Sequence, residues 1–144
     1  MVKIREMTIG DYDDVIELMK NTNGIAIRDA DSKELTERYL IRNPGLSFIA
    51  EKDSKLIGCV MCGYDGRRGY LQHLIVIPEY RKKGIGKSLV GRCLAKLHSL
   101  GIYKTHIDVL ITNTEAICYW ERAGWKLRDD IVRFSYIGSG KENA

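Results

Sequence analysis

The segment joining an apolar strand to an amphipathic helix constrains this chain more than any other feature. Residues 70–77 are rich in apolar side chains and read as a strand ended by Pro78, and residues 84–100 carry apolar side chains at helical spacing. Between them, residues 81–88 read RKKGIGKS. Backbone N–H groups at the start of a helix lack an intrahelical acceptor and carry partial positive charge. With basic side chains around them, such groups form a site suited to a pyrophosphate.

Two nucleotide-binding motifs can be tested against this loop by spacing. A Walker P-loop requires a glycine five residues before Gly86, where this chain has Arg81. A Rossmann fingerprint requires a glycine three residues after Gly86, where this chain has Leu89. Both motifs fail, so binding of ATP or NAD is not expected. An ordinary basic loop that caps a core helix remains an alternative on local chemistry alone.

The rest of the chain alternates between strand and helix signals. Its order is β-α-α-β-β-β-α-β-α-β, which predicts a mixed sheet with helices on both faces. The expected strands are residues 2–7, 46–51, 56–64, 70–77, 103–111 and a last one around 131–136, and the expected helices are 8–21, 32–43, 84–100 and 113–123.

Length and composition predict one ordinary domain. The chain has 144 residues, of which we assign 1–137 to a single domain and 138–144 to a polar tail. The N-terminus has no apolar stretch typical of a secretory signal, and no apolar run is long enough for a membrane span, so we expect a cytoplasmic protein. The net charge of +4 is spread along the chain apart from one local basic cluster and predicts no nucleic-acid partner, and the short apolar runs predict no membrane partner.

The cysteines give no metal or redox motif. Cys59 and Cys62 form a C-x-x-C, but residues three apart in a strand point to opposite faces. No second C-x-x-C and no paired histidines complete a zinc site. We therefore expect reduced, structural cysteines and no metal.

Two motifs together resemble the GNAT superfamily of N-acetyltransferases. Residues 81–86 match its acyl-CoA motif, Q/R-x-x-G-x-G/A. Downstream, Asn113-x-x-Ala116, Glu121 and Gly124-Trp125 resemble its second motif. Residues 63–69 also resemble a loop of some small, poorly characterised bacterial members. The resemblance implies a GNAT-like, mostly antiparallel mixed sheet, in agreement with the order of elements.

The resemblance also implies a function. It predicts transfer of an acetyl group from acetyl-CoA to a primary amine of a small molecule or protein, by direct attack in a ternary complex. Backbone amides of the loop would bind the pyrophosphate, and the strand before it would pair with the pantetheine arm. The residues expected to contact the cofactor are Leu74, Ile75, Val76, Arg81, Lys82, Lys83, Gly84, Ile85, Gly86, Lys87, Ser88, Asn113 and Trp120.

The catalytic groups depart from the family pattern. The usual acid is a tyrosine seven residues after the motif asparagine, a position that Trp120 occupies here. The neighbouring Tyr119 is the candidate acid, and His73, on the strand before the loop, is the candidate base because imidazole titrates near neutrality. An acyl-CoA-binding or sensor module without turnover is the alternative function. The sequence leaves open whether the protein forms a homodimer.

Overall fold

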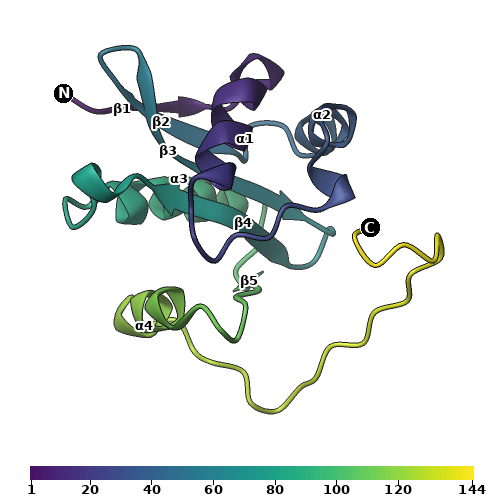
Figure 1. Ribbon diagram of the computed structural model, residues 1–144. Helices are drawn as coiled ribbons and strands as arrows, with labels where there is room; N and C mark the ends of the chain where they lie inside the picture. Colours follow the sequence, from purple (N-terminus) through teal and green to yellow (C-terminus); the bar gives the residue numbers. More distant parts are fainter. The chain divides into compact units, whose positions relative to one another are not determined.

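Five strands form one sheet in the order β1-β2-β3-β4-β5 in the computed structural model, which describes all 144 residues (Figure 1). Neighbouring strands are antiparallel except β4 and β5, which run parallel. The predicted mixed, mostly antiparallel sheet is therefore confirmed. The strands are β1 (Lys3–Glu6), β2 (Phe48–Lys52), β3 (Lys55–Tyr64), β4 (Gly69–Val76) and β5 (Thr105–Ile107).

Helices cover both faces of this sheet, as the sequence predicted. Figure 1 shows α1 in front of the sheet and α3 behind it. The helices α1 (Tyr12–Lys20) and α2 (Lys33–Arg42) precede β2, whereas α3 (Ile85–Ser99) follows β4. Ser32 begins α2 because its hydroxyl accepts the N–H of Leu35 at 3.2 Å.

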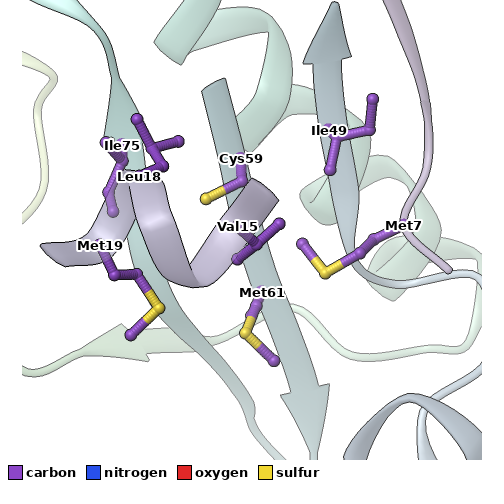
Figure 2. Close-up of a cluster of buried hydrophobic side chains, with 8 residues drawn as sticks. All are labelled: Met7, Val15, Leu18, Met19, Ile49, Cys59, Met61 and Ile75. Atoms are coloured by element: carbon purple, nitrogen blue, oxygen red, sulfur yellow. The ribbon is translucent and has the colours of Figure 1, made fainter. Parts of the chain in front are cut away.

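The core on the α1 face is a cluster of aliphatic and sulfur-containing side chains (Figure 2). Val15, Leu18 and Met19 of α1 pack against Cys59 and Met61 of β3. Burying an aliphatic side chain of this size contributes about 1.5–3 kcal/mol, so this contact holds α1 on the sheet.

The two residues of the C-x-x-C lie on opposite faces of the sheet, as expected. Cys59 belongs to the α1 cluster, whereas Cys62 lies against Cys93 of α3. All four cysteines are free thiols, and Cys118 is the exposed one. The pair therefore contributes to packing rather than forming one site.

An ion pair fixes the entry into α1. The guanidinium of Arg5 donates to both carboxylate oxygens of Asp11, at 2.8 and 3.0 Å, and the N–H of Thr8 donates to the same carboxylate at 2.9 Å. Burial alone would raise the pKa of Asp11, but the hydrogen bonds from Arg5 and Thr8 outweigh it and lower the pKa. Asp11 is therefore ionised and buried at the first turn.

The C-terminal part differs from the sequence prediction in two ways. The strand expected over residues 103–111 is limited to Thr105–Ile107, and the strand expected around 131–136 is absent. A strand requires a neighbour for its N–H and C=O groups, and none pairs with residues 131–136. Their apolar side chains are also exposed, Phe134 to 92%. An alternating apolar pattern is therefore not sufficient to make residues 131–136 a strand.

The chain divides into two compact units, Met1–Asp108 and Val109–Ala144. The first contains the sheet with α1, α2 and α3. The second contains one regular element, α4 (Thr114–Arg122), which is the helix expected over 113–123. The single domain over residues 1–137 stays a prediction.

Candidate functional site

The glycine loop presents a row of unused backbone donors. A short 3-10 turn, Pro78–Tyr80, follows β4, and α3 begins at Ile85. The N–H groups of residues 82–87 donate to no other protein group. The N–H of Ser88 donates to the carbonyl of Gly84 at 3.0 Å and is the first one used inside the helix. The available donors therefore end at Lys87.

The backbone of Gly84 holds this row in place. Gly84 has φ of +82°, a left-handed conformation that glycine adopts without strain. A Cβ built on this residue would meet no atom within 4 Å. The glycine is therefore needed for its backbone angle, and the space above it is open to a ligand.

Basic side chains surround the loop and partly fix it. The Arg81 Nε donates to the carbonyl of Val76 at 2.8 Å, which ties the loop to the end of β4. The ammonium groups of Lys83 and Lys52 lie 5.6 and 5.5 Å from the centre of the Tyr80 ring. Both distances are within the range of a cation–π interaction. Unused N–H donors, an open glycine and nearby cations together fit a pyrophosphate.

One edge of β4 is open beside this loop. β5 pairs with β4 only through Gly69–Leu71, and no strand pairs with that edge over Gln72–Val76. The predicted residues Leu74, Ile75 and Val76 lie in this stretch. An extended ligand with amide groups can hydrogen-bond to such an edge as an added strand would.

A β-bulge interrupts β4 where its edge opens. Cys59 is opposite Ile75 and Met61 is opposite Gln72, so two residues of β4 oppose one of β3. His73 lies in the bulge with φ of +51°, and its carbonyl accepts a hydrogen bond from the Cys59 thiol at 3.4 Å. A non-glycine residue in this region costs about 1–3 kcal/mol and is typical of functional sites.

The imidazole of His73 forms a pair with a carboxylate. Its Nε2 lies 3.0 Å from Oδ1 of Asp31, and each of the two side chains is 15% exposed. Asp31 ends a 3-10 turn, Asp29–Asp31, just before α2. Sequence reasoning missed this pair, because the two residues are 42 positions apart and no spacing rule links them.

Asp31 is itself held by two further contacts. Its Oδ2 accepts the N–H of Arg28 at 2.8 Å, and its carbonyl accepts the hydroxyl of Tyr12 at 2.6 Å. Burial would raise the pKa of Asp31, but the hydrogen bonds from His73 and Arg28 outweigh burial and lower the pKa. The carboxylate is therefore ionised at neutral pH.

A hollow of about 240 Å³ lies between the end of α2 and the β3–β4 hairpin. Tyr39, Tyr70 and Gln72 are among its lining residues. The hydroxyl of Tyr39 is buried and has no hydrogen-bond partner. Gly63 makes room for this arrangement, because a Cβ there would lie 2.8 Å from both the Tyr39 hydroxyl and the Asn43 amide nitrogen.

The second unit contains the remaining predicted residues. The Asn113 side chain accepts the N–H of Ala116 at 3.1 Å and begins α4. Trp120 is buried, with its ring 4.6 Å from the ring of Trp125 and 5.2 Å from that of Tyr119. Burial raises the pKa of the Tyr119 phenol. His73 and the glycine loop thus share the first unit, whereas Asn113, Tyr119 and Trp120 belong to the second.

No group of three or more His, Cys, Asp or Glu side chains is arranged to hold a metal ion. None of the helices combines the length and the apolar character that crossing a membrane requires.

A family model described as "Acetyltransferase (GNAT) family" matches residues 12–125. An acetyltransferase of Sodalis glossinidius is 31% identical over 132 residues, which cover 91% of this chain and 92% of that protein. An uncharacterised N-acetyltransferase of Yersinia pestis is 33% identical over the same shares. The chain therefore belongs to the GNAT family and is an N-acetyltransferase.

The fold supports this assignment. PaiA N-acetyltransferase from Thermoplasma acidophilum, solved in complex with coenzyme A, superposes with a TM-score of 0.79 and 25% identity. The match covers 90% of this chain and 92% of that one. The resemblance drawn from the two sequence motifs is therefore confirmed.

Proposed function

We propose that acetyl-CoA is the acyl donor and that residues 82–87 bind its pyrophosphate. The observation that carries this proposal is the row of backbone N–H groups without a protein acceptor. The open edge of β4 at Leu74–Val76 binds the amide groups of the pantetheine arm. Arg81, Lys83 and Lys87 add positive charge around the phosphates.

The acceptor is a primary amine of a small molecule or a protein. Its nitrogen attacks the thioester carbonyl carbon directly in a ternary complex, the C–S bond breaks, and the electron pair leaves on sulfur. A lysine-like amine has a pKa near 10.4, so presenting it uncharged at pH 7 costs about 4–5 kcal/mol. A base beside the amine lowers this cost.

His73 and Tyr119 are the candidates for proton transfer. His73 lies at the bulge where the edge of β4 opens, and serves as the base that accepts the amine proton. Tyr119 is the candidate acid for the departing thiolate. The family resemblance also assigns Asn113 and Trp120, on the helix that carries the second family motif, to binding of the donor.

The decisive experiment measures free thiol released from acetyl-CoA with a panel of polyamines, aminoglycosides, amino acids and N-terminal peptides. Release with one class of amine identifies the acceptor. Calorimetry with acetyl-CoA, ATP and NAD runs alongside, and acetyl-CoA is expected to bind far more tightly than the other two. Comparable affinity for ATP would refute the proposed site, and tight acetyl-CoA binding without thiol release from any amine would favour the sensor module.

A further inference from the structure

We propose that Asp31 is a positioning residue that holds His73 with Nε2 protonated and leaves Nδ1 as the nitrogen that takes the amine proton. The inference rests on the proposed function, since it assigns the base of that reaction. It adds a residue that the sequence motifs did not indicate, and it decides which atom of the imidazole reacts.

The donors and acceptors of the two side chains determine which nitrogen of His73 carries the proton. An ionised carboxylate only accepts hydrogen bonds, so the 3.0 Å contact between Asp31 Oδ1 and His73 Nε2 requires a proton on Nε2. A neutral imidazole carries one N–H, so its other nitrogen has a lone pair. Nδ1 has no hydrogen-bond partner within the protein. Nδ1 is therefore the imidazole nitrogen that can accept a substrate proton.

The surroundings of Asp31 prevent the pair from rearranging. Its second carboxylate oxygen accepts the N–H of Arg28, and its carbonyl accepts the hydroxyl of Tyr12. On the other side, the bulge fixes the backbone of His73, whose carbonyl accepts a hydrogen bond from the Cys59 thiol. Contacts other than their mutual hydrogen bond thus hold both Asp31 and His73 in place.

This arrangement determines where the proton and the electron pair go during acetyl transfer. The amine nitrogen forms the new bond to the carbonyl carbon and loses one proton to Nδ1 of His73. The C–S electron pair leaves on sulfur, and the imidazolium then returns its proton to the thiolate or to solvent. The Asp31 carboxylate stabilises the imidazolium while it exists, because opposite charges in contact favour the charged form.

Other groups near the pair do not change charge where the base acts. Burial, followed by the charges of Asp31 and Asp13, raises the pKa of the Tyr12 phenol. Burial raises the pKa of the Cys59 thiol to about 12. Neither the Tyr12 phenol nor the Cys59 thiol therefore contributes to the acid limb of the pH profile.

The first test is independent of turnover. The ¹⁵N shifts of the His73 imidazole, read by NMR in the wild-type protein at a pH where it is neutral, are expected to show the Nε2–H tautomer. In Asp31→Asn, whose amide can accept or donate, a mixture with the Nδ1–H tautomer is expected. A wild-type ring protonated at Nδ1 would overturn the proposal, whether or not an acceptor amine has been found.

The second test uses the amine that releases thiol in the panel. Asp31→Asn is expected to lower kcat about 10- to 100-fold, within the range of general base catalysis, with an unchanged KM for acetyl-CoA. The acid limb of kcat/KM is expected to move about one pH unit lower, because the imidazolium loses its counter-charge. Asp14→Asn, the same change at an exposed position of α1, is expected to alter neither.

A double-mutant cycle separates positioning from a general structural effect. If Asp31 acts through the imidazole, adding Asp31→Asn to His73→Ala has no further effect on kcat. Full additivity of the two losses, or an acid limb that stays in place in Asp31→Asn, would overturn the proposal. Absence of thiol release by the wild-type protein would instead count against the proposed function.

Discussion

Replacing Gly84 with alanine isolates the contribution of the loop backbone. Gly84 has φ of +82°, and a Cβ built there meets nothing within 4 Å. The variant therefore introduces no clash, and its cost is the left-handed conformation itself, about 1–2 kcal/mol for a residue with a Cβ. For a chain of this size, a loop that kept this angle would lower Tm by about 3–8 °C, and relaxation of the loop makes the fall smaller.

The effect on acetyl-CoA binding follows from the same strain. In the free variant the loop relaxes to a negative φ and turns its N–H groups away from their present row. Binding must then restore the left-handed angle, so about 1–2 kcal/mol is subtracted from the binding free energy. Calorimetry is expected to give acetyl-CoA affinity about 5- to 30-fold weaker.

The other end of α3 supplies a matched control. Gly101 has φ of +80°, and a Cβ built there also meets nothing within 4 Å. Gly101→Ala is expected to lower Tm by a similar amount and to leave acetyl-CoA affinity unchanged. Equal affinities of both variants and the wild-type protein, at equal losses of Tm, would refute the assignment of the loop and leave it as a helix cap.

Other predictions concern the acid, the packing and the pH dependence. Tyr119→Phe is expected to lower turnover less than about tenfold, and Trp120→Tyr to keep or raise it; a thousandfold loss in Tyr119→Phe with intact CoA affinity would identify that phenol as the acid. Gly63→Ala is expected to cost about 1–3 kcal/mol in urea unfolding, because its Cβ would lie 2.8 Å from the buried Asn43 amide nitrogen. Asp11→Asn is expected to cost about 1.5–3 kcal/mol at neutral pH. Its carboxyl has a lowered pKa when folded, so this stabilisation is present above the ordinary value of 3.8 and is lost as pH falls through the lowered one.

The sequence predicted the features that depend on neighbours along the chain. Ser32 at the start of α2 and Gly101 after α3 are local signals, because a hydroxyl or a positive φ is needed at those positions. The strands expected over residues 46–51 and 56–64 left only a short connection between them, and Asp53 and Ser54 there adopt the positive φ values that a two-residue turn needs. The loop at residues 81–86 was found in the same way.

Features set by distant contacts were not predicted. His73 was proposed as a base from its residue type, but its positive φ comes from register with β3, and its partner Asp31 lies 42 positions away. The strand around residues 131–136 failed for a related reason. Alternating apolar side chains give a segment the capacity to form a strand, whereas a free sheet edge at the right place decides whether it does.

The unpartnered hydroxyl of Tyr39 sets a trade-off between the stability of the fold and the recognition of a ligand. A buried polar group without a hydrogen bond costs about 1–3 kcal/mol. Tyr39→Phe removes that cost while keeping the ring, so the variant is expected to be more stable and better suited to crystallisation. The same phenol is the buried side-chain polar atom of this hollow that has no hydrogen-bond partner, so a ligand that bonded to it would break no existing contact. Selection for thermal resistance and selection for ligand discrimination therefore act on this atom in opposite directions.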